Sequence, residues 1–404
     1  MGTREGVLGL AVLLFAPACG AKSGLNVRER DAAGVPDAPA PYEPRGCAEV
    51  RHGAVPASLV PLVDVLFVID DSGSMIEEQE ALGAAFPTMA EALATGDLDG
   101  DGRVDFPPVT DLHAGVVTTD LGLLAPAGEE RSIEWACTTG GSLGGDQGLL
   151  LLPDPTLECA GEMDGYFVRY REGEPLEAFT RAFACRALVG TDGCGFEQPL
   201  EAALVALTPS TSPLRFAAGA VGHGDGLNAG FVRAASILAV VVLTDEDDGS
   251  LANTTYLEVE TREELVLGEA WFHPLSRYAD GFVALRAEDP DRFVAAVIAG
   301  LPVDLAPTDP SSPVDYDRIL ADPRMQRVFI DADDGIDVIP SCEVDGLGRA
   351  IPPRRLVTLA RDLGDRALVQ SICQEDLRPA LGVITARLGK LVRETWCVDG
   401  EAGR

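Results

Sequence analysis

Lysine is almost absent from this chain, which has only Lys22 and Lys390, and acidic residues outnumber basic ones by 65 to 31. The formal net charge of -34 repels phosphate backbones and anionic lipid surfaces, and it favours the uptake of cations. Nucleic acid is therefore not an expected partner. The same acidity also keeps a protein soluble, so it does not by itself indicate a binding site.

Apolar runs long enough to cross a bilayer are also missing. The short run Val7–Phe15 follows Arg4 and ends in the sequence APAC at Cys19, a pattern typical of a cleaved signal peptide over residues 1–19. These last four residues resemble a bacterial lipoprotein box, in which the thiol of Cys19 is acylated. We expect an exported protein, with its lipid anchor as its contact with the membrane. It is an outer-membrane or cell-surface lipoprotein if Cys19 is acylated, and periplasmic or secreted if cleavage leaves it without lipid.

Cysteines in a C-x-x-C spacing are absent as well, so the sequence does not indicate a zinc or thiol redox site. Without Cys19, eight of the nine cysteines remain, and this even number can pair completely in an oxidising compartment. The disulfide candidates are Cys47, Cys137, Cys159, Cys185, Cys194, Cys342, Cys373 and Cys397. Their connectivity does not follow from the sequence.

Residues 20–46 are rich in proline, alanine and glycine and contain almost no large apolar side chain. Such a segment cannot bury enough surface to fold, so we expect a disordered, partly extended tether. The folded body then comprises residues 47–397.

Within this body, apolar runs of strand length alternate with amphipathic segments of helical spacing. This alternation predicts an α/β fold with a doubly wound, mostly parallel sheet. The predicted strands are Leu62–Ile69, Leu112–Asp120, Ser236–Asp245, Phe293–Ile298 and Ala367–Ile372, and the predicted helices cover Leu82–Leu93, Glu197–Leu207, Thr261–Ala270, Leu275–Leu285 and Leu377–Leu391. Glycine-rich loops, three cysteines and one amphipathic helix interrupt the pattern over about residues 122–193, and Cys194 follows just past its end. We interpret this segment as an insertion stapled by disulfides.

Two acidic loops follow predicted strands. Asp70, Ser72 and Ser74 come directly after the first strand, and Asp245 follows the run AVVVL. Because ligands bind beyond the carboxyl ends of the strands in such sheets, we expect the two loops to meet there. Carboxylate and hydroxyl oxygens are hard ligands that suit Mg²⁺ or Mn²⁺. The alternative for Asp70 is a helix N-cap. For residues 246–248 we expect a solvated acidic turn, with a role in ion binding as the alternative.

The sequences VDVLFVIDDSGSM and AVVVLTDEDD together resemble the von Willebrand factor A family, over roughly residues 61–391. The resemblance implies a metal-ion-dependent adhesion site that binds an acidic side chain of a protein ligand. It places Asp70, Ser72, Ser74 and Asp245 around the ion. The family also has a threonine before the helix that begins near Glu197. Here only Thr191 is available at a loose spacing, with Glu197 or Asp192 as possible substitutes.

A second cation signal lies in the sequence DLDGDGRVD. Within a predicted calcium loop over residues 97–108, the ligand positions are Asp97, Asp99, Asp101, Arg103 through its carbonyl, and Asp105. Position twelve is Pro108, which has no carboxylate, and Asp111 is a candidate replacement. We expect at most a lone Ca²⁺ loop, with an ordinary acidic turn as the alternative. The sequence DADDGID over Asp331–Asp337 has a looser spacing.

The residues favour a binding protein over an enzyme. A haloacid-dehalogenase-like phosphatase also carries an aspartate after its first strand, but Ser72 stands where its second aspartate belongs. The other alternative is a structural protein of the cell envelope, in which the ion only stabilises loops. The four histidines are not spaced as a zinc site or a catalytic dyad.

The export signal leads to a first prediction. The mature protein should begin at Cys19 and carry the mass of an acylated N-terminus, which intact-mass spectrometry of the membrane fraction measures. A Cys19→Ala chain should appear in the soluble fraction. A wild-type chain that begins at Cys19 without lipid would contradict acylation.

Overall fold

The computed structural model describes residues 61–122, 145–157, 159, 165–252, 271–309, 312–332, 335–344 and 348–402. Its main sheet has six strands in the order β10-β5-β4-β1-β2-β3. They are β1 (Leu62–Ile69), β2 (Asp111–Thr118), β3 (Phe167–Arg171), β4 (Ile237–Leu243), β5 (Phe293–Ala299) and β10 (Ala367–Ser371). Five strands run parallel, and β3 pairs antiparallel with β2 at the edge. The predicted α/β class with a mostly parallel sheet is confirmed.

Both faces of the sheet are buried, which explains why its strands are almost continuously apolar. Along β1, Phe67 and Ile69 belong to one hydrophobic core, while Leu66 and Val68 belong to a second core on the opposite face. All seven residues of β4 are buried. A strand with this environment cannot alternate apolar and polar residues, because it has no solvent face.

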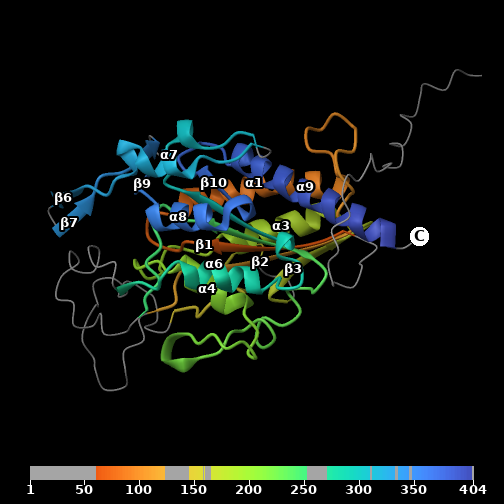
Figure 1. Cartoon of the computed structure of the whole chain (residues 1–404), viewed down its shortest axis with the longest axis horizontal. Helices are drawn as coiled ribbons and strands as arrows, with labels where there is room; N and C mark the ends of the chain where they lie inside the picture. Colours follow the sequence, from red (N-terminus) through yellow and green to blue (C-terminus); the bar gives the residue numbers. More distant parts are fainter. Residues whose placement is uncertain are drawn as a thin grey trace, which may run out of the picture. The chain divides into compact units, whose positions relative to one another are not determined.

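Helices cover the two faces in separate layers (Figure 1). The first core contains residues of α1 (Ile76–Thr95), α3 (Leu176–Ala187) and α9 (Arg378–Ala402). The second contains residues of α4 (Pro199–Leu207), α6 (Ser276–Ala284), α7 (Tyr316–Ala321) and α8 (Arg354–Leu363). Among the described residues, no helix is both long and apolar enough to cross a membrane.

Part of the predicted insertion belongs to the main fold. β3 extends the sheet, and α3 packs on α1 through Phe183, whose ring stacks on Phe86 with the centroids 3.7 Å apart. The disulfide Cys159–Cys185 ties α3 to the segment before β3. The second half of residues 122–193 is thus a structural part of the sheet and its helical layer, and residues 123–144 lie outside the described residues.

Two short hairpins, which the sequence did not indicate, lie between α7 and α8. They are β6 (Phe329–Ala332) with β7 (Gly335–Val338), and β8 (Cys342–Val344) with β9 (Gly348–Ala350). The disulfide Cys342–Cys373 joins the second hairpin to the loop after β10. Cys194 is also disulfide-bonded. The signal peptide, the tether, the predicted helix Thr261–Ala270 and the side chains of Cys47, Cys137 and Cys397 lie outside the described residues.

The packing of α3 gives a second prediction. Phe183→Ala removes a fully buried ring that stacks on Phe86, so it should lower the free energy of unfolding by about 3–5 kcal/mol in urea titrations. Leu152→Ala is the control, because Leu152 is 54% exposed. A loss of less than about 1 kcal/mol at Phe183 would show that α3 is a peripheral part of an insertion.

Candidate metal centre

The two acidic loops meet at the point where the connections of the sheet diverge. β1 lies between β2 and β4, and the chain proceeds from β1 towards one edge of the sheet and from β4 towards the other. In doubly wound sheets this divergence leaves a crevice beyond the carboxyl ends of the two strands. Asp70 follows β1 and Asp245 follows β4 at this crevice.

Asp70 is completely buried and joins the ends of the two strands. Its amide donates to the carbonyl of Leu243, and its Oδ2 accepts a hydrogen bond of 2.5 Å from the Thr244 hydroxyl. Its Oδ1 accepts from the amide of Ser72 at 2.8 Å. Burial raises the pKa of Asp70 above its usual range, against the effect of these hydrogen bonds. The carboxylate has neutral donors as partners, so its charge is not balanced by them.

The remaining motif residues lie around this carboxylate. The hydroxyl oxygens of Ser72 and Ser74 are 3.4 Å apart, and Ser74 is exposed on the pocket described below. Asp245 is 7% exposed, and its Oδ1 has no hydrogen-bond partner among the described residues. Burial, followed by the charges of Asp70 and Glu246, raises the pKa of Asp245 to about 8.

The structure places Glu197 near the fifth predicted position. Glu197 is 3% exposed, lines the same pocket as Ser74 and Asp245, and has a buried Oε1 without a hydrogen-bond partner among the described residues. Burial, and then the charges of Glu246 and Asp70, raise its pKa well above its usual range. Thr191 is half-buried and does not line this pocket, and Asp192 is exposed. Of the three candidates, Glu197 is the one that lines the pocket with Ser74 and Asp245. Among the described residues, the carboxylate oxygens of Asp70, Asp245 and Glu197 do not form a group within 4.8 Å of one another.

Asp71, the second residue of the motif, belongs to a different group of carboxylates. Burial, followed by the charges of Asp120, Asp70 and Asp146, raises its pKa to about 8. Its carbonyl accepts from the amide of Gly193, and a Cβ at Gly193 would lie only 2.2 Å from the Asp71 carboxyl carbon. A side chain at position 193 would therefore displace the Asp71 carboxylate. The sequence did not indicate this group, because Asp120 and Asp146 are not spaced as a motif.

The solvated turn that the sequence predicts for residues 246–248 is wrong for two of its three residues. Asp247 and Asp248 are 7% and 1% exposed. Asp247 accepts from the amides of Arg355 and Leu356 at the start of α8, and it forms an ion pair with Arg327. Asp248 pairs with the Arg355 guanidinium at 3.0 Å. These two aspartates anchor α8, and only Glu246 of the three is partly exposed.

A pocket of about 330 Å³ opens beside the candidate ion site. Asp245, Glu246 and Glu197 line one part of it. Its other walls come from Phe196, from Phe272, and from the two hairpins through Phe329 and Arg349. The disulfide Cys342–Cys373 therefore ties a wall of the pocket to the edge of the sheet.

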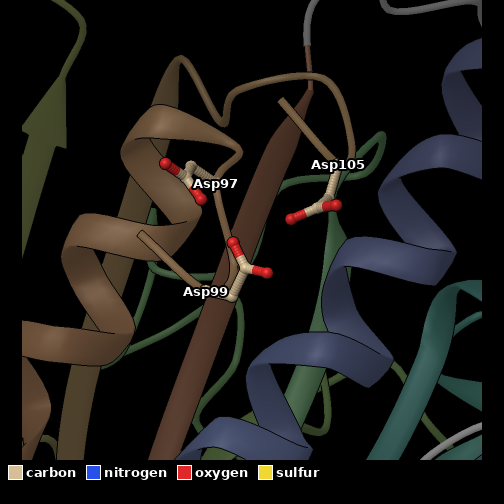
Figure 2. A group of neighbouring side chains, drawn as sticks. All are labelled: Asp97, Asp99 and Asp105. Carbon is tan, nitrogen blue, oxygen red and sulfur yellow. The ribbon is translucent and has the colours of Figure 1, made fainter. Parts of the chain in front are cut away.

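The predicted calcium loop also brings carboxylates together (Figure 2). Oxygens of Asp97, Asp99 and Asp105 lie within 4.8 Å of one another, whereas Asp101 is not part of this group. Asp97 accepts from the amides of Gly100 and Gly102, so backbone hydrogen bonds also organise the loop.

Two other candidates for calcium binding, Asp111 and the segment Asp331–Asp337, lie elsewhere in the structure and form ion pairs there. Asp111 is paired with Arg169 and Arg233, so it does not complete the loop. Asp331 and Asp337, at the two ends of the looser spacing, lie on the hairpin of β6 and β7. Asp337 pairs there with Arg349.

No family model, curated protein or solved structure matches this chain. The geometry of the site and the local sequence resemblance are therefore the observations from which a function is argued.

The buried carboxylates predict a pH dependence. Asp71 and Asp245 have pKa values of about 8 when folded, against 3.8 for an ordinary aspartate, so the folded chain retains protons that the unfolded chain has released. In EDTA, the free energy of unfolding should fall as the pH rises from about 7 to about 9. Asp245→Asn should reduce this fall. Stability that is constant or rising over this range in urea titrations would contradict the assignment.

Proposed function

We propose that this protein is an exported binding module that holds a divalent cation between the ends of β1 and β4 and captures a protein ligand beside it. The observation that carries the proposal is a pair of carboxylates, Asp245 and Glu197, that line one pocket. Each has a buried oxygen, Oδ1 and Oε1 respectively, without a hydrogen-bond partner among the described residues. Buried charges of one sign are costly unless a cation or protons compensate them.

The donor set suits Mg²⁺ or Mn²⁺. Asp70, Asp245 and Glu197 would supply carboxylate oxygens, and Ser72 and Ser74 would supply hydroxyl oxygens, directly or through water. The bound ion would neutralise part of this charge and fix the two loops that border the pocket. The resemblance to the von Willebrand factor A family supports the same ion position, with Glu197 in place of the family's threonine.

A binding role accounts for the site better than phosphoryl transfer does. A phosphatase needs a free cationic side chain against the phosphate. The arginines of the pocket, Arg327 and Arg349, are already paired with Asp247 and Asp337. The alternative of a structural envelope protein, in which the ion stabilises loops only, leaves the adjoining pocket without a role.

The remaining proposals concern the second cation and the location of the protein. We propose that the loop of Asp97, Asp99 and Asp105 holds Ca²⁺ and stabilises the connection from α1 to β2. The protein would be anchored to the outer membrane or the cell surface through lipid on Cys19, or would be periplasmic or secreted without it.

Metal titration tests the ion site. By calorimetry with Mn²⁺, Asp245→Asn and Glu197→Gln should each weaken binding at least about tenfold, which corresponds to about 1.4 kcal/mol, because each removes a charged ligand. Thr191→Val is the matched control and should bind as the wild type does. Wild-type affinity in both test variants, or a loss confined to Thr191→Val, would refute the assignment.

Ligand capture tests the binding role. A protein retained from cell envelope by the wild-type chain in Mg²⁺ should be lost in EDTA and lost with Asp70→Asn. A Glu288→Gln chain is the control, because Glu288 is an exposed residue away from the site. A ligand that is fully retained in EDTA would leave the ion a structural role only.

A further inference from the structure

We propose that the pocket beside the ion receives a basic side chain, lysine or arginine, from the protein ligand. This inference rests on the proposed function and changes its expected partner, which the family resemblance gives as an acidic side chain. Three properties of the pocket carry it: the pairing of its arginines, the excess of its carboxylates and the nature of its apolar walls.

The positive charges around the pocket are already balanced by neighbouring carboxylates. Arg327 pairs with Asp247, and Arg349 pairs with Asp337 at 2.7 Å. Arg355, behind the pocket wall, pairs with Asp248. Because each of these arginines has its own aspartate, none of them offsets the other carboxylates of the site.

Four further carboxylates lie at the site, those of Asp70, Asp245, Glu197 and Glu246. Asp70 is bonded to the Thr244 hydroxyl and the Ser72 amide, which are neutral, and the side chains of Glu197 and Glu246 are hydrogen-bonded to each other. The lining of the pocket has an excess of carboxylates over cationic side chains, which gives it a negative charge. Its carboxylates are those of Glu197, Asp245, Glu246, Asp247, Asp248 and Asp337, and its arginines are Arg327 and Arg349. A further carboxylate from a partner would enter against this charge, whereas an ammonium or guanidinium group would compensate it.

The apolar walls suit the stem of the same side chain. Phe196, Phe272 and Phe329 line the pocket, and lysine and arginine bury their methylene groups against such surfaces while the charged end stays near polar groups. Aromatic faces also attract a guanidinium group. The ring of Phe272 already has the guanidinium carbon of Arg355 5.0 Å from its centroid. The volume of about 330 Å³ lies at the small end of ligand pockets, which fits an inserted side chain.

Peptides that differ in one residue test the inference. Fluorescein-labelled GGSRSGG, GGSDSGG and GGSLSGG are titrated with the mature full-length protein in saturating Mg²⁺, and fluorescence anisotropy reports binding. We expect the arginine peptide to bind at least about tenfold tighter than the aspartate peptide. Its binding should weaken when salt is added, because salt screens the attraction between charges. Tighter binding of the aspartate peptide, or no binding of the arginine peptide at millimolar protein, would overturn the inference.

Variants locate the contact in the pocket. Phe329→Ala and Glu246→Gln should each weaken the binding of the arginine peptide several-fold, while Val328→Ala, at an exposed neighbouring position, should leave this affinity unchanged. Equal effects of Phe329→Ala and Val328→Ala would place the peptide elsewhere and overturn the inference. Mn²⁺ calorimetry on the wild type separates the two proposals. Metal binding without a preference for arginine refutes this inference alone, and absence of metal binding refutes the proposed function.

Discussion

The buried carboxylate of Asp70 is the constraint around which the candidate site is organised. Its backbone and side chain bond to Leu243 and Thr244, so the ends of β1 and β4 are held together by the same residue that introduces a negative charge into the interior. Neutral donors orient this carboxylate without cancelling its charge. The surrounding loops must then supply a cation site or accept protons, and the raised pKa values of Asp70 and Asp245 express that requirement.

The loop after β4 shows how a neighbouring position changes the role of a carboxylate. Asp247 and Asp248 are also buried, yet arginines and the first amides of α8 compensate them, so they hold a helix in place. Asp245 faces the pocket and lacks such partners at its Oδ1. An aspartate that anchors a helix, such as Asp247 or Asp248, has a positively charged donor nearby, and the candidate ligand Asp245 has none at its Oδ1. Residue type alone does not reveal this difference.

The main sheet was predictable because burial on both faces leaves a strong apolar signal in β1, β2, β4, β5 and β10. The short edge strand β3 carries alternating polar residues, so the sequence pattern does not distinguish it from the predicted insertion. The hairpins of β6 to β9 are only three or four residues per strand, too short for periodicity to indicate them. They nevertheless form a wall of the pocket, so elements that periodicity does not indicate contribute to the candidate site.

The sequence by itself determined the fold class, and it predicted four positions of the candidate site, because Asp70, Ser72 and Ser74 lie on one short loop and Asp245 follows an unmistakable buried strand. Only the tertiary structure shows that Glu197, and not Thr191, lines the pocket with Ser74 and Asp245, since this depends on how the loop before α4 crosses the end of the sheet. It also decided the charge of the pocket. Arginines distant in the sequence pair with Asp247, Asp248 and Asp337, and pairing of this kind follows from packing in space.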